Sequence, residues 1–175
     1  MESKRVSESL ITITHQMTPQ DANLAGNVHG GIILKNIDNT AGIVASRHAN
    51  TNAVTASIDR VDFHSPVFVG DLLRLKSAVN YAGNTSMEIG VRVEAENFMT
   101  GEVRHTASAY LTFVALDANG KPTRVPKIIL ESKEERRRNR EARNRRKARL
   151  RERKKEEVSS RVAVHAGHPT RSPLK

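Results

Sequence analysis

The chain has 175 residues, and 29 basic against 19 acidic side chains give it a formal net charge of +10. Residues 1–130 hold 12 side chains of each sign, so the whole excess lies in residues 131–175. The absence of cysteine excludes disulfides, thiolate metal sites and a cysteine nucleophile, and it favours a reducing, cytoplasmic compartment. No apolar run approaches the roughly 18 residues of a membrane span. We therefore expect one domain without a membrane span, followed by a basic extension.

The N-terminal third predicts a short strand, a loop and a helix. Residues 8–15 alternate apolar and polar side chains, as a strand does. Residues 18–31 are rich in turn formers and predict a loop. Residues 31–48 carry apolar side chains at helical spacing around most of the circumference. Such a helix is expected to be covered by other elements on most of its surface.

Four long alternating segments follow the helix and predict strands. They cover residues 53–63, 73–81, 87–96 and 103–116, with turn signals such as Gly83-Asn84 between them. In chain order they predict a four-stranded meander after the first strand and the helix. One helix on one antiparallel sheet of about five strands is an α+β arrangement.

The last 45 residues have a different composition. Residues 136–155 include 13 Lys or Arg in 20 positions and no apolar stripe, so we expect no ordinary packed helix there. Two Glu–Arg pairs at i,i+4 spacing support a solvated helix by about 0.2–0.5 kcal/mol each. The pairs are Glu134–Arg138 and Glu141–Arg145. Residues 159–175 are predicted to be disordered.

Few segments carry recognisable chemistry. The sequence has no P-loop, nucleophile elbow or dinucleotide fingerprint, and its seven His lack metal-ligand spacing, so we expect no metal and no cofactor. What remains is Gly-Asn-Val-His-Gly-Gly at residues 26–31, where the predicted helix begins. The amides of Gly30 and Gly31 would lie where unpaired N–H groups and the helix dipole can receive an oxyanion. The alternative is an ordinary helix start with Asn27 or His29 near the cap.

Asp38 lies at the edge of the predicted apolar face, beside Gly31 and Gly42 on the helical wheel. A carboxylate among such small residues leaves room for a ligand, and the alternative is an exposed pair with Lys35. Gly31 and Asp38 are about 10 Å apart along a helix, and Asn27 lies further away still. If Asn27 and Asp38 serve one reaction, one of them comes from a second copy, most simply across a two-fold dimer.

Four motifs together resemble the hotdog-fold acyl-CoA thioesterases, in particular their cytosolic acyl-CoA hydrolase branch. They occupy residues 25–31, 37–42, 62–66 with Gly70-Asp71, and 83–88. The resemblance covers about residues 8–125, which leaves residues 131–175 as a separate basic tail. It implies a sheet wrapped around a central helix, an edge-paired dimer, and a hexamer built as a trimer of dimers. It also implies hydrolysis of an acyl-CoA thioester to free acid and CoA, with CoA as part of the substrate.

The resemblance also implies roles for individual residues. Asp38 matches the helix acid, as general base for water or as nucleophile. Asn27 matches the motif asparagine and would orient water or thioester across the dimer, while the Gly30 and Gly31 amides polarise the carbonyl. Four further residues are expected near CoA, although each also reads as an ordinary turn or surface residue. They are Arg60, His64, Thr85 and Ser86.

Two other functions fit the sequence. The chain could be a non-catalytic acyl-CoA sensor or scaffold, although such a protein has no need of a base at Asp38. The basic tail could instead be the main functional part, by binding nucleic acid or an anionic surface. It has no aromatic side chain for stacking on bases and no recognition motif.

Overall fold

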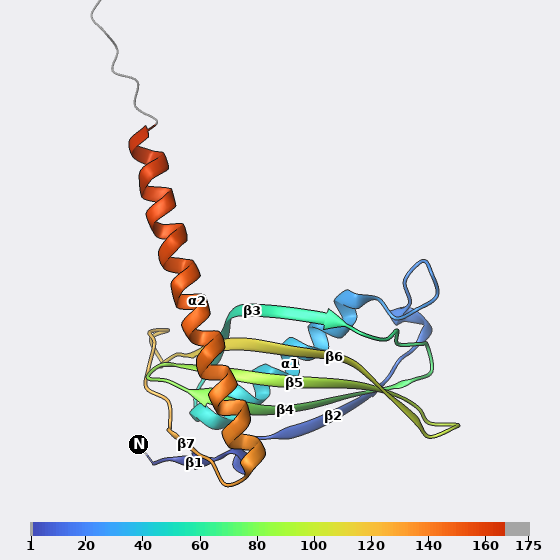
Figure 1. Cartoon of the computed structure of the whole chain (residues 1–175). Helices are drawn as coiled ribbons and strands as arrows, with labels where there is room; N and C mark the ends of the chain where they lie inside the picture. The colour runs from blue at the N-terminus through green and yellow to red at the C-terminus, as the bar shows by residue number, and fades with distance from the viewer. Residues whose placement is uncertain (1, 167–175) are drawn as a thin grey trace, which may run out of the picture.

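The computed structural model describes residues 2–166, without the side chains of Arg60 and of residues 157–166. One antiparallel sheet wraps around helix α1 (Gly30–Ala49), and helix α2 (Lys133–Ala166) crosses the opposite face of this sheet (Figure 1). The sheet is built from β2 (Ile11–Gln16), β3 (Ala53–Phe63), β4 (Leu72–Ala82), β5 (Ser86–Asn97) and β6 (Glu102–Ala115). The smaller elements are β1 (Lys4–Arg5), η1 (Val6–Glu8), η2 (Pro19–Asp21) and β7 (Ile128–Ile129).

The strand order is β2-β4-β5-β6-β3, so only β4, β5 and β6 form a meander. The predicted four-stranded meander is wrong for β3, which pairs with β6 at the far edge and not with β4. The connection from β3 to β4 passes the loop that precedes α1, where Val28 N donates to Val67 O at 2.9 Å. The chain therefore crosses from the edge strand β3 to β4, next to the edge strand β2 on the other side of the sheet, around the start of α1.

The inner face of the sheet and α1 form the core. Ile37, Ala41 and Val44 of the helix and Leu75 and Ile89 of the sheet are fully or almost fully buried. The alternation of the strands produces this face, and the wide apolar surface of α1 fills the concave side. The prediction that the helix is largely covered is confirmed.

Specific contacts fix both ends of α1. The Gly31 N–H donates to His29 Nδ1 at 2.8 Å, which caps the helix at its start. Asn50 ends the helix in the left-handed conformation, with φ of 55°. The Lys4 ammonium donates to Asn50 Oδ1 at 2.6 Å and to Arg47 O at 2.7 Å, which satisfies a carbonyl of the last turn.

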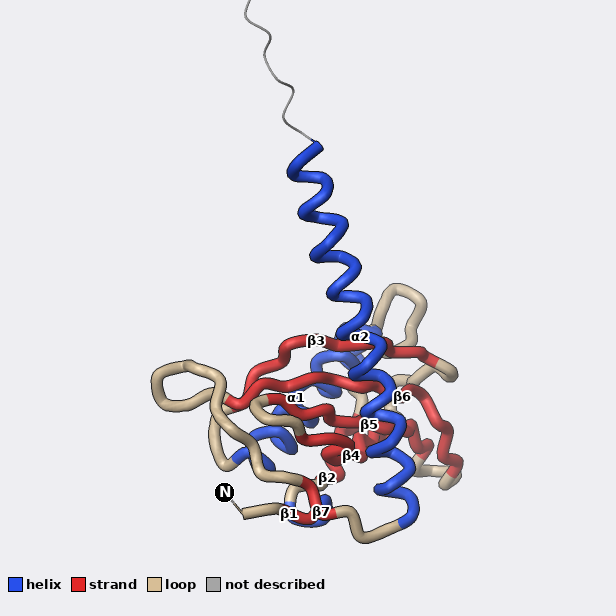
Figure 2. The backbone as a smooth tube through the Cα atoms, turned by 60° about the vertical axis from the view of Figure 1, so that its left-hand side comes forward, coloured by secondary structure: helices blue, strands red, loops and turns tan. Residues whose placement is uncertain are grey.

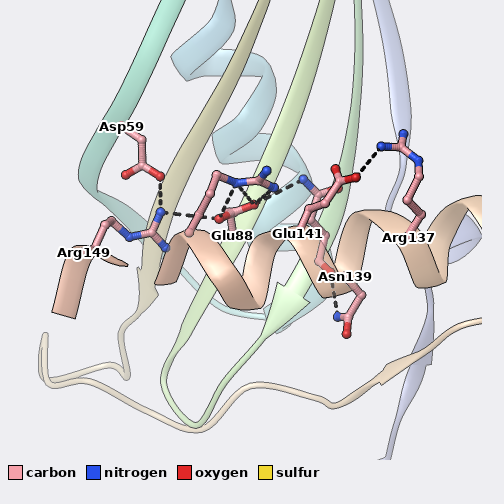
Figure 3. Close-up of polar contacts among 8 residues, drawn as sticks. Asp59, Glu88, Arg137, Asn139, Glu141 and Arg149 are labelled. Carbon is pink, nitrogen blue, oxygen red and sulfur yellow. Dashed lines mark hydrogen bonds and ion pairs between the residues drawn. The ribbon is translucent and has the colours of Figure 1, made fainter. Parts of the chain in front are cut away.

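The prediction that the basic tail does not pack as a helix is wrong for its first half. Helix α2 runs over β4, β5, β6 and β3 in that order (Figures 1 and 2). Asn139 Nδ2 donates to Asn80 O at 2.8 Å, and the Ala142 side chain is completely buried. Arg145 contacts Glu88 at 2.7 Å, and Arg149 contacts Asp59 (Figure 3).

Polar contacts dock α2 because the outer face of the sheet offers a buried carboxylate. Glu88 is only 1% exposed, and the Arg145 guanidinium that contacts it also lies 3.6 Å from the Tyr110 ring centroid. Arg145 therefore does not form the predicted i,i+4 pair with Glu141, whereas the predicted Glu134–Arg138 pair is present at 2.9 Å.

Beyond the sheet, α2 continues as a helix to Ala166. The predicted disorder of residues 159–175 is thus wrong up to residue 166, because the helix continues from its docked half. Residues 167–175 lie outside the described residues. Within the described part of the chain, no helix is both long and apolar enough to cross a membrane. Whether residues 8–125 fold and act without the tail stays a prediction.

Replacing Glu88 by Gln should loosen the attachment of α2, because Arg145 then lies against the sheet without a carboxylate. Since Arg145 is 25% exposed and regains some water, we expect a loss of about 1–3 kcal/mol in unfolding free energy by urea titration. Glu141→Gln, which removes an exposed helix pair, should cost less than about 0.5 kcal/mol. Equal losses for the two variants would contradict the assigned role of Glu88.

His48 should make stability depend on pH. Its side chain is fully buried, with Nε2 3.1 Å from Pro126 O, and burial lowers the pKa of the imidazole from its ordinary value of 6.5. The folded protein therefore keeps His48 neutral, while the unfolded chain protonates it as pH falls through 6.5. We expect stability to fall below this pH until the lowered pKa is reached. Urea unfolding at pH 8 and pH 5 should show a smaller difference for His48→Gln than for the exposed control His15→Gln.

Candidate functional site

Asp38 faces β3, which is an edge strand of the sheet. It lies in the third turn of α1, half-buried, and its Oδ1 accepts a hydrogen bond of 2.6 Å from Thr55 Oγ1 on β3. The predicted alternative was an ion pair with Lys35, and no such pair is present among the described residues. A carboxylate held by one hydroxyl keeps its second oxygen available for chemistry.

An open groove of about 570 Å³ runs along Asp38 between α1 and β3. It is lined by about two turns of the helix, by the start of the strand and by Phe113 of β6. Gly42 adds no side chain to the groove. The sequence predicted this effect, because small residues beside Asp38 leave room for a ligand. The groove therefore offers space for a ligand directly beside the carboxylate.

Asn27 lies in the loop before α1, half-buried, where it forms an isolated bridge to Phe68. Its main chain contacts Asn23: Asn23 N donates to Asn27 O at 2.7 Å, and Asn27 N donates to Asn23 Oδ1 at 3.2 Å. Asp38 is eight residues into the helix from Gly30, about 12 Å along its axis. Among the described residues no hydrogen bond joins Asn27 to Asp38, in agreement with the sequence spacing.

The two glycines are the first residues of α1. The Gly31 N–H already donates to His29 Nδ1, so this amide serves the cap and cannot at the same time receive an oxyanion. A Cβ at Gly31 would lie 3.0 Å from His29 Nδ1, so a larger residue there would push against the capping side chain. The predicted alternative of a capped helix start therefore applies to Gly31. The Gly30 amide stays a candidate to donate a hydrogen bond to the oxyanion.

The residues expected near CoA fall at opposite ends of the sheet. Arg60 lies on β3, and its side chain is not described. His64 follows β3 near the start of α1, with its ring centroid 5.3 Å from that of His105. Thr85 is the last residue of the β4–β5 turn and Ser86 is the first residue of β5, near the other end of β3. One chain therefore does not bring His64 together with Thr85 and Ser86.

The sequence pattern did not single out Thr55 and Asn23. Thr55 reads as one more polar position in an alternating strand, and only the packing of β3 beside α1 places it on Asp38. Asn23 lies in a loop of turn formers, where its Oδ1 accepts from Ala25 N at 2.9 Å as well as from Asn27 N. No group of three or more His, Cys, Asp or Glu in the described part of the chain could hold a metal ion.

A family model described as Thioesterase superfamily matches residues 25–102. An uncharacterized acyl-CoA thioester hydrolase of Bacillus subtilis (strain 168) is 42% identical over 134 residues, covering 77% of this chain and 78% of that protein. The cytosolic acyl coenzyme A thioester hydrolase of Rattus norvegicus is 38% identical over 146 residues. That match covers 82% of this chain but 38% of the rat protein.

Solved structures extend the similarity into the tail. An apo-hexameric acyl-CoA thioesterase has a TM-score of 0.84 and 41% identity, covering 87% of this chain and 97% of its own. An acyl-CoA hydrolase from Staphylococcus aureus in complex with butyryl coenzyme A and coenzyme A has a TM-score of 0.80 and 36% identity. The match covers 94% of this chain and 98% of the Staphylococcus aureus chain. Coverage of 94% must include part of α2, so the likeness does not end near residue 125 as expected.

Three further structures of the Staphylococcus aureus hydrolase carry alanine in place of an asparagine, an aspartate or a threonine. Together with the family match and the Bacillus subtilis relative, these findings confirm the resemblance seen in the motifs. The chain belongs to the thioesterase superfamily, among its acyl-CoA thioester hydrolases.

Proposed function

We propose that this protein hydrolyses the thioester of acyl-CoA to a free carboxylic acid and CoA, with Asp38 as the general base. The observation that carries the proposal is the Asp38–Thr55 hydrogen bond in an open groove, in a chain that belongs to the acyl-CoA hydrolases. The protein needs no cofactor for this reaction, because water is the second reactant. We place it in the cytoplasm, like its cytosolic relative.

The arrangement around Asp38 suits base catalysis. Thr55 holds Oδ1, and Oδ2 has no hydrogen-bond partner among the described residues, so Oδ2 can accept a proton from water. The resulting hydroxide attacks the thioester carbonyl, the C–S bond breaks, and the proton goes to the leaving thiolate of CoA. Thr55 is then a positioning residue. Direct attack by Asp38 through an anhydride is the alternative route.

Residue spacing supports Asn23 as the asparagine that assists Asp38. In the Staphylococcus aureus hydrolase, the substituted asparagine comes first in the chain, followed by the substituted aspartate and then the substituted threonine. In this chain Asn23, Asp38 and Thr55 stand in the same order and with the same two separations along the sequence. The motif resemblance assigned this role to Asn27. Asn27 lies closer to Asp38 along the sequence, so it does not match the asparagine–aspartate separation of the Staphylococcus aureus hydrolase.

The loop geometry also favours Asn23. Its Oδ1 is held by the amides of Ala25 and Asn27, while its Nδ2 has no partner among the described residues. An amide nitrogen oriented in this way can donate to the thioester carbonyl oxygen as negative charge develops there. The Gly30 amide is a second candidate donor. In this arrangement Asn27 acts through its main chain, by holding Asn23 in place.

We further propose that each active site is shared by two copies of the chain. The loop of residues 22–29, here called the entry loop, lies at the N-terminal end of α1 (Figure 1). Asp38 lies further along the helix, beside β3. β3 is an edge strand with exposed Val54, Ile58 and Phe63, so two copies can pair along it around a two-fold axis. Three such dimers would form a hexamer, the state named for a similar thioesterase.

A dimer would also bring separate parts of two chains around CoA. Arg60 and His64 lie toward the C-terminal end of β3, whereas Thr85 and Ser86 lie near its N-terminal end. Two strands that pair antiparallel place opposite ends side by side. We therefore keep all four residues as proposed neighbours of CoA, from the two copies together.

Asp38→Asn should lower kcat for acyl-CoA hydrolysis by about 10²–10⁴-fold, because the base is lost. Thr55→Val should lower kcat less, by about 10-fold, with little change in KM, since it only positions the carboxylate. Lys35→Gln, on the same helix, should keep full activity. Free-thiol release measured with acyl-CoAs of several chain lengths tests these expectations. Full activity of Asp38→Asn would refute the mechanism, and a wild-type protein that binds acyl-CoA without turnover would be a sensor.

The two asparagines give opposite expectations. Asn23→Ala should lower kcat by about 10²-fold, as expected when one oxyanion donor is lost. Asn27→Ala keeps the main-chain contacts and should retain most activity. Thermal unfolding of both variants checks that the loop keeps its structure. A large loss for Asn27→Ala together with an active Asn23→Ala would return the role to Asn27.

A further inference from the structure

The glutamates of α2 lie on one face of the helix, and a row of cations lies on another. With Asn139 at zero and about 100° per residue, the five glutamates between residues 133 and 156 fall within about 200–320°. The residues that dock on the sheet, Ala142, Arg145 and Arg149, lie on this side as well. A row of cations falls within about 60–160° instead. Six of them form the basic stripe: Lys133, Arg140, Lys147, Arg151, Lys154 and Lys155.

The six residues of the basic stripe face solvent. All of them are exposed, and none has an ion-pair partner among the described residues. Two other arginines in this sector are engaged, because Arg136 donates to main-chain carbonyls and Arg137 contacts two glutamates. On other sides of α2, Arg145 and Arg149 contact Glu88 (Figure 3). Glu88 and Asp59 of the sheet thus neutralise the arginines that meet the sheet, and the stripe keeps its charge.

The basic stripe is also long. From Lys133 to Lys155 it spans 23 residues of helix, about 33 Å along the axis. Figure 1 shows that α2 continues beyond the β3 edge, so the far part of the stripe stands clear of the sheet. This length is close to one turn of duplex DNA, about 34–36 Å, and a helix fits the width of its major groove.

We propose that the basic stripe binds the phosphate backbone of duplex nucleic acid without sequence preference. Six unpaired cations on one face can neutralise phosphates and release their condensed counterions. The stripe has no aromatic side chain that would stack on the bases of a single strand, which favours a duplex. This surface is separate from Asp38, which lies on the opposite face of the sheet.

The composition of α2 argues against a lipid surface as the partner. A helix that lies in a membrane interface buries an apolar face. Between residues 133 and 156 the apolar residues are Ala142, Ala148 and Leu150, and Ala142 is already buried against the sheet. The stripe therefore offers charge without an apolar surface to insert.

Fluorescence anisotropy of a labelled 24-base-pair DNA duplex with the full chain tests the proposal. If six phosphates are contacted, affinity should fall about 10³-fold between 50 and 200 mM salt. The variant Arg140→Gln/Lys147→Gln removes two stripe charges and should make the slope of log K against log salt shallower by about 1.8. The matched control Lys121→Gln/Arg124→Gln removes two exposed charges from the body and should keep the slope. Acyl-CoA hydrolysis should be the same in all three proteins.

Two results would overturn the proposal. One is equal duplex affinity for the stripe variant and the control variant. The other is tighter retention on phosphatidylcholine vesicles with about 30 mol% phosphatidylserine, which carry an anionic surface, than on the duplex. Circular dichroism of both variants checks that α2 stays helical, as expected because Gln is a good helix former.

Discussion

The buried helix α1 is the constraint on which the rest of the structure depends. Its apolar surface fills the concave face of the sheet, and its ends are fixed by His29 at the start and by Lys4 and Asn50 at the end. Because the rise per residue of an α-helix is constant, α1 fixes the distance between the entry loop and Asp38. No loop movement at the N-terminus can change where Asp38 lies along this helix.

The same helix brings Asp38 to an edge strand, whose open side can accept a neighbour. Thr55, which holds the carboxylate, belongs to β3, and β3 pairs with β6 on one side only among the described residues. An edge strand with exposed apolar side chains invites pairing with a second copy. The proposed site and the proposed interface therefore both depend on β3. Residues 1–130, which contain them, carry no net charge, so the proposed chemistry does not depend on one.

The spacing of apolar residues predicted the extent of α1 and of the long strands, because these depend on interactions between residues close in the chain. It could not predict that β3 pairs with β6, because pairing joins residues far apart in the chain. The docking of α2 was missed because it depends on Glu88, which is buried and meets Arg145 from 57 residues away. Asp38 stood out as a carboxylate on an apolar face. Thr55 and Asn23 did not, since a polar residue in a strand or a loop is ordinary until its neighbour in space is known.

The central claim, that two copies share each site, is tested most directly by mixing two inactive variants. Asn23→Ala and Asp38→Ala chains are unfolded together and refolded, so that mixed dimers form. A mixed dimer contains one site with both residues intact, so random pairing should restore about a quarter of wild-type activity. Each variant refolded alone should stay inactive. No recovery in a mixture that mass spectrometry shows to contain mixed dimers would contradict the account and place both residues in one chain's site.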